Sequence, residues 1–578
     1  MNKKEIVKIL EEIGTILELK GENPFKSRAY FNAARTIETN SGDVVQMVKD
    51  GSIDSLKGVG QAISEKLKIL VSTGELPYYQ NLKASIPSGL FDLLKIPGMG
   101  PKKVKTIYEK LHIKSIGELE YACLENRLRD LDGFGEKSQE KILRNIELHK
   151  KYNERYHYHT AQREAENLFK YLKGNQYITR LAVAGSLRRK KETIRDIDFV
   201  ASCAPDNRES IMDYFTNYPD KEDILGHGPT KSAIVLSSGM HCDLRLVEDE
   251  QYPFLLHHST GSKEHNTAMR QRAKSLGLTM NEYGLFPEGS EVSIKCKDET
   301  EIFNQLKLTY IEPELRENMG ELEAAENNTL PQLVAKDEIL GLFHAHTTHS
   351  DGANTIKEMA EACKTMGFKY LGVTDHSKSA FYANGLTEDR IKKQQDEIDQ
   401  INSETKDFVI FKGIEADILP DGRLDYDDKI LATFDFVIAS VHSSFQMNED
   451  EMTERICRAL MNPYVTMLGH PTGRLLLGRE AYPHKMEEIL ETAARYNRVV
   501  EINANPHRLD LDWRWGKKTN ALNIKTSINP DAHTIEMLED YQIGLGIARK
   551  AWFSSDSVLN TYMPEDLIKL FESIRNTQ

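Results

Sequence analysis

Apolar residues recur at helical spacing through the first 150 residues of the chain. The first such run consists of Ile6, Val7, Leu10, Ile13, Ile16 and Leu17. Three glycine pairs follow, and each pair separates two short apolar runs. The pairs are Gly58 and Gly60, Gly98 and Gly100, and Gly133 and Gly135. This pattern predicts an α-helical region in which one small unit is repeated.

Near residue 160 the pattern changes to short apolar strands that alternate with helical runs. The first predicted strands cover 181–184, 196–201 and 234–236. Residues from about 313 to 336 are rich in Glu, Asn and Pro, which predicts a linker. The strands predicted beyond it cover 370–374, 409–411, 436–440 and 499–502. Because they end in polar residues and alternate with helices, they predict an α/β barrel or a layered sheet.

The composition narrows the class of protein. A chain of 578 residues is too long for one hydrophobic core and predicts several domains. The sequence has neither a run of about 18 apolar residues nor a signal-peptide core, so we expect no membrane span. The six cysteines form no C-x-x-C pair, which is typical of a reduced, cytoplasmic protein. The net charge of -14 argues against a basic coat, although a local basic face could still bind nucleic acid.

The glycine pairs indicate contacts with a phosphate backbone. Glycine permits a tight turn and leaves backbone N–H groups uncovered at the positive end of the next helix. Lys102 follows the second pair and adds positive charge. One pair alone would be better explained as an ordinary helix cap, but three pairs in the same setting favour DNA phosphate contacts. These segments resemble helix-hairpin-helix motifs.

A basic position in the first repeat, Lys66, follows Lys26 and Tyr30 along the chain. A lysine beside a phosphate site could attack a sugar aldehyde as a Schiff-base nucleophile. From the sequence alone, a solvated helix lysine is the simpler explanation for Lys66.

A predicted strand carries Asp196 and Asp198, which face the same side because they are two residues apart. A later strand can add Asp243. Three carboxylates around two divalent metal ions suit nucleotidyl transfer. The turn before the first strand offers backbone N–H groups and positive charge to a triphosphate. Its candidate residues are Gly185, Ser186 and Arg189.

Together with Thr260-Gly261-Ser262, these motifs make residues 1–315 similar to the family X DNA polymerases. The resemblance implies that Asp196, Asp198 and Asp243 bind Mg²⁺ or Mn²⁺ for catalysis. The implied nucleotide-binding residues are Gly185, Ser186, Arg189, Asn266 and Arg270. Lys66 matches the Schiff-base lysine of the family's lyase members, and Lys26 and Tyr30 match positions that hold the 5′-phosphate of a gap.

Two positions depart from the pattern of that family. Arg195 stands where the family usually has a small residue, often glycine, directly before the first aspartate. Ser259 lies in a His-His-Ser run where the family tends to carry an aromatic residue against the nucleotide sugar. These are the positions at which sugar selection and catalytic rate would depart from the family.

From Gly341 onward, histidines and carboxylates form a series of short motifs, nearly all of which follow apolar strands. The motifs are H-x-H at 344–346, S-D-G at 350–352, T-D-H at 374–376, G-I-E at 413–415, S-V-H at 440–442, G-H-P at 469–471 and D-A-H at 531–533. Strand ends converge at one mouth of an α/β barrel, so such residues can meet. Any single histidine could be an ordinary core residue, but this many favour a metal centre that hydrolyses phosphoesters.

This series is similar to a PHP (polymerase and histidinol phosphatase) domain over about residues 338–578. The resemblance implies a distorted (β/α)₇ barrel that holds up to three Mn²⁺, Zn²⁺ or Fe ions. The implied ligands are His344, His346, Asp351, His376, Glu415, His442, His470, Asp531 and His533.

A polymerase followed by a PHP domain is typical of bacterial family X polymerases. The resemblance implies DNA repair by gap filling and 3′–5′ exonuclease trimming, with gapped or nicked DNA and dNTPs as substrates. We expect a monomer in the bacterial cytoplasm, associated with the nucleoid during repair. The expected parts are a helical DNA-binding and lyase-like domain (1–85), helix-hairpin-helix fingers (86–155), a nucleotidyltransferase palm (156–250), a thumb (251–315), a linker (316–336) and the PHP domain (337–578).

Two alternatives stay open at this point. In the first, the polymerase half is weakened and mainly positions DNA for a PHP nuclease, as Arg195 and Ser259 suggest. In the second, the PHP domain hydrolyses small phosphomonoesters, although such a substrate would not need the glycine repeats.

Overall fold

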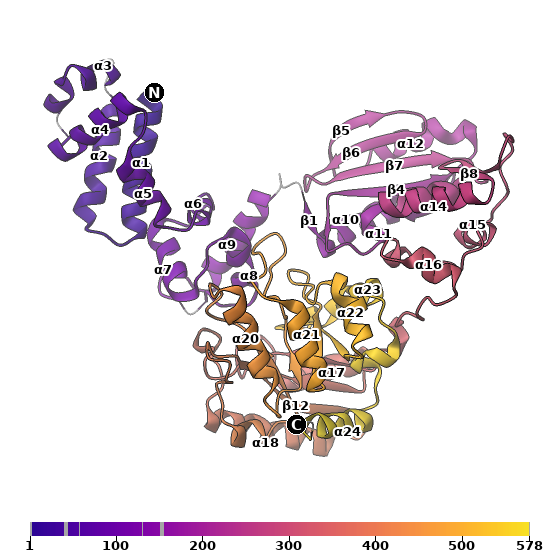
Figure 1. The fold of residues 1–578 in the computed structure, drawn as a ribbon. Coiled ribbons are helices and arrows are strands. Elements are labelled where there is room, and N and C mark those ends of the chain that lie inside the picture. The colour runs from indigo at the N-terminus through magenta and orange to yellow at the C-terminus, as the bar shows by residue number, and fades with distance from the viewer. Residues whose placement is uncertain (1–2, 40–43, 57, 130, 151–154, 577–578) are drawn as a thin grey trace. The chain divides into compact units, whose positions relative to one another are not determined.

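The computed structural model describes residues 3–39, 44–56, 58–129, 131–150 and 155–576. Contacts divide the chain into two compact units, Met1–Lys150 and Lys151–Gln578. The first unit is α-helical, as its apolar spacing predicts. Its helices are α1 (Lys3–Leu19), α2 (Pro24–Thr39), α3 (Val44–Lys49), α4 (Gln61–Thr73), α5 (Pro77–Ala84), α6 (Gly89–Leu93), α7 (Pro101–Leu111), α8 (Ile116–Leu124) and α9 (Glu136–Lys150) (Figure 1).

Two hydrophobic cores lie within this unit. The apolar face of α1 packs with α2 and α4 around Ile13 and Leu67, and a second core surrounds Val104 between α6 and α9. Each glycine pair lies directly before a helix. The second glycines of the pairs precede α4, α7 and α9, as the repeat predicts.

The second unit begins with a sheet that carries the Asp-x-Asp strand. Within residues 155–576, all of which are described, this sheet has five strands in the order β2-β4-β7-β6-β5. Its elements are β1 (Tyr156–His157), α10 (Tyr158–Lys173), β2 (Arg180–Val183), α11 (Gly185–Arg188), β3 (Thr193–Ile194), β4 (Asp196–Ser202), α12 (Arg208–Thr216), β5 (Lys221–His227), β6 (Lys231–Leu236) and β7 (His241–Val247). The following elements are α13 (Tyr252–Thr260), α14 (Lys263–Ser275), β8 (Leu278–Asn281), β9 (Gly284–Pro287) and α15 (Glu299–Gln305).

The segment predicted to be a linker, 316–336, is folded and partly buried. It follows a 3₁₀ turn (Pro313–Leu315) and contains α16 (Glu321–Glu326). Arg316 and Glu321 are both 0% exposed. Arg316 forms an ion pair with Glu299, and Glu321 accepts a hydrogen bond from His265 at 2.7 Å. A polar composition predicted a linker, but these charged side chains have partners inside the fold.

The remainder of the unit is a parallel barrel surrounded by helices (Figure 1). Its strands follow chain order: β10 (Gly341–Ala345), β11 (Tyr370–Val373), β12 (Val409–Asp417), β13 (Phe436–Ser440), β14 (Met467–Leu468), β15 (Val499–Asn503) and β16 (Thr526–Asn529). Its helices are α17 (Ile356–Thr365), α18 (Glu388–Glu404), α19 (Asp428–Leu431), α20 (Glu449–Leu460), α21 (Met486–Arg495), α22 (Gly516–Ala521), α23 (Tyr541–Lys550) and α24 (Pro564–Arg575). A parallel bridge between Ala345 and Ala532 brings the first and last strands together, which confirms the predicted seven-stranded barrel.

Aromatic side chains fill the end of the barrel where its strands begin. Tyr370 and Phe436 are the first residues of β11 and β13. Phe571 of α24 belongs to the same cluster and stacks on the Phe436 ring. Gly413 makes room for this cluster, since a Cβ there would lie 2.4 Å from the Phe436 ring. The packed end leaves the opposite end, where the strands finish, to carry polar side chains. None of the helices among the described residues is both long enough and apolar enough to cross a membrane.

Candidate metal centre and DNA-processing sites

The nine predicted metal ligands lie at or just beyond the carboxyl ends of the barrel strands. His344 and Glu415 belong to β10 and β12, and the other seven follow a strand in a loop. All nine side chains are at most 8% exposed. A parallel barrel aims its strand ends at a common mouth, so residues far apart in the sequence meet there.

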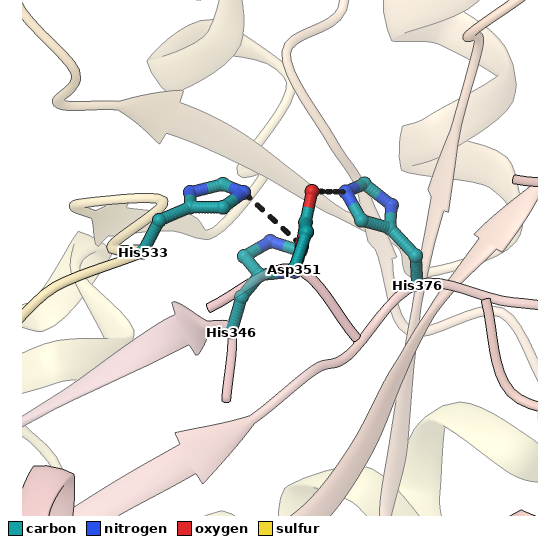
Figure 2. A group of neighbouring side chains, drawn as sticks. All are labelled: His346, Asp351, His376 and His533. Carbon is teal, nitrogen blue, oxygen red and sulfur yellow. Dashed lines mark ion pairs between the residues drawn. The ribbon is translucent and has the colours of Figure 1, made fainter. Parts of the chain in front are cut away.

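One group of these ligands surrounds Asp351, which lies in the loop after β10. The Oδ1 atom of Asp351 lies 3.5 Å from His533 Nε2 and 3.7 Å from His346 Nδ1, and its Oδ2 atom lies 3.6 Å from His376 Nε2. Figure 2 shows the four side chains converging, with Asp351 between His376 and His533. Their ligand atoms all lie within 4.8 Å of one another, which is close enough to share a metal ion.

Two further groups adjoin the first because they share its histidines. His344, His346 and Asp531 form one group, and His376, Glu415 and His442 form the other. The remaining predicted ligand, His470, lies outside these three groups, but its Nε2 atom is 2.9 Å from Glu415 Oε1. The structure therefore brings all nine predicted residues into one continuous cluster.

The chemistry of this cluster fits divalent cations. Burial raises the pKa of the Glu415 carboxyl, but the rings of His442, His344 and His376 lower it more, so that the pKa lies well below its usual range. The pKa of Asp531 is likewise lowered by His344 and other histidines, against its burial. Among the described residues, several buried ring nitrogens of the cluster, including both of His346, make no hydrogen bond. Ionised carboxylates and unsatisfied imidazole nitrogens together are the donors that Zn²⁺, Mn²⁺ and Fe bind.

The Glu501 carboxylate supports the cluster, although no role for it was predicted from the sequence. This carboxylate is 0% exposed and lies 2.5 Å from His344 Nδ1. It also accepts a hydrogen bond from the His470 backbone N–H at 2.6 Å. With Nδ1 of His344 donating to Glu501, Nε2 is left available to face a metal ion, which is how outer carboxylates usually orient ligating histidines.

Two more supporting carboxylates were missed from the sequence. Asp417 Oδ1 lies 2.5 Å from His442 Nδ1, and Asp375 accepts hydrogen bonds from Thr347 and Gln394. Asp417 could have been found, because it is two residues after Glu415 on the same strand and so faces the same side. Asp375 belongs to the T-D-H motif but faces the loop that carries Asp351.

The three carboxylates predicted for the polymerase site meet on the five-stranded sheet. β4 and β7 are parallel neighbours, and their register places Asp198 beside Asp243. Burial, and then repulsion from Asp196 and Asp243, raises the pKa of Asp198 to about 6. Lys231 of β6, which the sequence did not single out, lies 2.6 Å from Asp243 Oδ2. Three acidic groups in one place fit a site that binds divalent cations.

The predicted triphosphate turn packs directly against these carboxylates. Gly185 has a φ of +63°, and a Cβ there would lie 2.1 Å from Asp198 Oδ2, so only glycine fits. Ser186 is half-buried next to it in α11. The guanidinium of Arg189 donates to the Thr260 backbone oxygen at 2.7 Å and to Glu317 at 3.1 Å. Arg189 is thus held within the protein.

The other predicted nucleotide-binding residues, Asn266 and Arg270, lie one turn apart on α14, where Arg270 is exposed. Asn266 donates from Nδ2 to the His258 backbone oxygen at 2.7 Å, which fixes the turn between α13 and α14. Of the two departures from the family pattern, Arg195 is exposed beside Asp196, and Ser259 is half-buried at the end of α13.

In the first unit, the predicted lyase residues gather around Tyr78, which the sequence did not indicate. The Lys66 ammonium lies over the Tyr78 ring at 4.9 Å, and Tyr30 stacks on the same ring at 6.5 Å. Lys26 is exposed and forms an ion pair with Glu22 at 2.9 Å. Lys66 itself donates to the Ala62 backbone oxygen at 3.0 Å.

The glycine pairs present open backbone. An added Cβ would meet nothing within 4 Å at five of the six glycines, and at Gly58 it would meet Thr36 at 2.7 Å. Gly60 and Gly100 are the N-terminal caps of α4 and α7, and neither helix has a side-chain cap. Lys102 is exposed in the first turn of α7. The uncapped N–H groups and the open space fit an approaching phosphate.

Comparison with known families covers most of the chain. Residues 1–76 match a helix-hairpin-helix domain, and residues 90–147 match a SAM-like helix-hairpin-helix tandem. Residues 255–317 match the DNA polymerase beta thumb. Residues 343–505 match the PHP domain. Both halves predicted from the motifs are therefore found.

A relative from Bacillus subtilis (strain 168), named DNA polymerase/3′–5′ exonuclease PolX, is 39% identical over 569 residues, which cover 98% of this chain and 99% of that protein. A probable phosphatase from Thermoanaerobacter sp. (strain X514) is 30% identical over 233 residues, 38% of this chain and 89% of the phosphatase. The chain belongs to the bacterial family X DNA polymerases with a C-terminal PHP domain, and it combines metal-dependent DNA polymerase and 3′–5′ exonuclease activities.

Proposed function

We propose that this enzyme repairs DNA by filling short gaps and by trimming 3′ ends that the polymerase cannot extend. The observation that carries the proposal is a buried nine-residue imidazole–carboxylate cluster in the same chain as three converging carboxylates on a palm sheet. Extension and trimming act on the same kind of DNA end, and one chain that does both can correct an end before filling.

In the polymerase site, Asp196, Asp198 and Asp243 hold Mg²⁺ or Mn²⁺, which neutralises charge on the nucleotide phosphates when bound. The backbone of Gly185 and Ser186 faces the triphosphate. Arg189 stiffens that turn through its contacts with Thr260 and Glu317. The remaining nucleotide contacts come from Asn266 and Arg270.

In the exonuclease site, the nine clustered side chains hold up to three ions of Mn²⁺, Zn²⁺ or Fe, which activate water and polarise the phosphodiester when bound. The protein's own part is to orient the imidazoles, and Glu501 and Asp417 do so at 2.5 Å from His344 and His442. Burial of the cluster keeps bulk water from competing for the ligands.

The substrates in this proposal are dNTPs and gapped or nicked DNA with a 3′ end. The open glycine turns at Gly58, Gly60, Gly98, Gly100, Gly133 and Gly135 and the nearby Lys102 grip the backbone. Lys26 and Tyr30 hold a 5′-phosphate, and Lys66 acts as a lyase nucleophile. The enzyme works as a monomer in the cytoplasm, on the nucleoid. Its parts are the helical domain (1–85), fingers (86–155), palm (156–250), thumb (251–315), connection (316–336) and PHP domain (337–578).

A second candidate is an exonuclease whose polymerase half mainly positions DNA. The ion pair between Lys231 and Asp243 favours it, because this cation competes with a metal ion for the same carboxylate. The exposed Arg195 beside Asp196 would compete in the same way.

Four proteins separate these candidates on DNA with a one-nucleotide gap whose 5′ side carries a deoxyribose phosphate: wild type, Asp196→Ala/Asp198→Ala, His344→Ala/His346→Ala, and Lys66→Ala. We expect the Asp196→Ala/Asp198→Ala protein to lose extension and the His344→Ala/His346→Ala protein to lose trimming. The Lys66→Ala protein should lose the lyase product that borohydride traps. Wild-type protein that trims but does not extend with either Mg²⁺ or Mn²⁺ would support the second candidate. Trimming that persists in the His344→Ala/His346→Ala protein would overturn the assignment of the metal centre.

A further inference from the structure

A lysine of the PHP barrel is buried against the polymerase palm. Lys550 ends α23 and is 1% exposed. Its ammonium lies 2.6 Å from Glu317 Oε1, 3.0 Å from the Arg189 backbone oxygen and 3.2 Å from the Glu314 backbone oxygen. An ammonium has three N–H donors, and a buried one is tolerated only when they are satisfied. These three acceptors therefore fix one geometry for the contact.

The contact reaches both the backbone and the side chain of Arg189. Lys550 bonds the Arg189 carbonyl directly, and the Glu317 carboxylate that it pairs with also accepts from the Arg189 guanidinium at 3.1 Å. Arg189 directly follows the Gly185–Arg188 turn, whose first residue packs on Asp198. Lys550 of the barrel thus supports the carboxyl end of the Gly185–Arg188 turn, and this turn is the one predicted to bind the triphosphate.

A tryptophan of the barrel holds the next part of the same segment. The Trp513 indole N–H donates to Glu192 Oε1 at 2.9 Å, and both residues are buried. The Trp513 ring lies 4.5 Å from the Lys550 ammonium and 5.1 Å from that of Lys191. Ring-to-cation contacts at this distance are attractive.

The held segment, residues 189–192, connects α11 to the strand that carries the catalytic aspartates. It is followed by β3 (Thr193–Ile194) and then by Asp196 at the start of β4. Glycine again allows a close approach on the barrel side, since a Cβ at Gly546 would lie 3.2 Å from the Lys190 side chain.

We propose that Lys550 and Trp513 are positioning residues for nucleotide incorporation, supplied to the polymerase by the PHP domain. They hold residues 189–192, and through them the Gly185–Arg188 turn, in the place where it receives the triphosphate. The inference rests on the proposed nucleotide-binding role of that turn. It assigns the PHP domain a part in polymerisation that needs none of its metal ligands.

The two activities of one chain provide the test, because each reports on folding for the other. Single-nucleotide incorporation on gapped DNA gives the KM for dNTP and kcat, and 3′ trimming of single-stranded DNA gives the exonuclease rate. The variants are Lys550→Met, Lys550→Arg and Trp513→Leu. The matched control is Lys569→Met, whose lysine side chain is 74% exposed on α24.

We expect Lys550→Met and Trp513→Leu to raise the KM for dNTP by about tenfold or more, since small displacements of a positioning group have effects of this size. The exonuclease rate should stay within about twofold of wild type. The KM of Lys550→Arg should lie closer to the wild-type value than the KM of Lys550→Met. An unchanged KM in both variants would overturn the proposal, and so would equal losses of both activities, which would indicate a general structural role.

The parallel Asp198→Ala protein separates this result from a failure of the proposed polymerase site. If Asp198→Ala still incorporates nucleotides, the catalytic role proposed for Asp198 is wrong, independently of the result for Lys550→Met. Loss of incorporation in Asp198→Ala together with an unchanged KM in Lys550→Met would remove only the positioning role.

Discussion

Glu501→Gln tests whether the metal centre depends on the carboxylate behind it. The Glu501 carboxylate accepts from four groups: His344 Nδ1 at 2.5 Å, the His470 N–H at 2.6 Å, Asn529 at 2.8 Å and Asn503 at 3.2 Å. Two of these donors face each oxygen. Whichever way a glutamine amide is turned, its NH₂ group therefore meets two donors, and His344 loses the negative charge that orients it.

Loss of such a supporting partner typically weakens metal binding by about 10- to 100-fold, or about 1.4–2.7 kcal/mol. We expect the Mn²⁺ concentration for half-maximal exonuclease activity to rise by about that factor. The assay is trimming of a labelled strand during Mn²⁺ titration of chelated protein, with the metal content of the purified protein measured alongside. The matched control is Glu454→Gln, at a side chain that is 71% exposed.

Extension of a gap by the same Glu501→Gln protein should change little, because the four groups that donate to the Glu501 carboxylate all belong to the barrel. An unchanged Mn²⁺ requirement together with an unchanged metal content would refute the role given to Glu501. A loss of extension equal to the loss of trimming would show that the substitution unfolds the chain.

Three further changes test other parts of the structure. Gly185→Ala places a Cβ 2.1 Å from Asp198 Oδ2 at a φ of +63°, so primer extension should fall at least about tenfold while trimming persists; normal extension would contradict the packing. Burial, and then Glu539, raises the pKa of Asp540 from 3.8 to about 7, so stability is lost as the pH rises from about 4 to about 7. At pH 8, Asp540→Asn should therefore increase the free energy of unfolding by at most about 4 kcal/mol and raise the melting temperature. At pH 4 it should change neither, and an equal shift at both pH values would contradict this. Lys102→Ala should weaken binding of all DNA sequences equally and reduce the salt slope by about one in fluorescence anisotropy, and a change for one sequence only would contradict a phosphate contact.

The fold was largely predictable because its signals are local. Apolar residues at helical spacing set α1, and a glycine pair before each apolar run marked the repeats of the first unit. In the barrel, the polar residues that follow short apolar strands predicted the mouth, since parallel strand ends must converge. His346 and His533 are 187 positions apart by their residue numbers, yet both follow barrel strands and their rings stack at 4.2 Å.

The parts that escaped prediction depend on tertiary contacts. A segment with the composition of a linker is folded and partly buried, because Arg316 and Glu321 pair with Glu299 and His265 elsewhere in the chain. Lys231 and Tyr78 had no motif around them, and their positions beside Asp243 and Lys66 follow only from strand pairing and helix packing. The contact of the barrel with the palm through Lys550 also depends on tertiary packing and could not be predicted from the sequence.

In the proposed function, one chain holds two separate metal-dependent sites that act on the same DNA end. The most direct test is a gapped substrate with a mismatched 3′ terminus, incubated with dNTPs and with a mixture of Asp196→Ala/Asp198→Ala and His344→Ala/His346→Ala proteins. We expect each variant alone to give no filled product from the mismatched end, and the mixture to give trimming followed by filling. If the His344→Ala/His346→Ala protein alone removed the mismatch and filled the gap, the separation of the two sites would be contradicted. Loss of trimming in both variants would contradict it too.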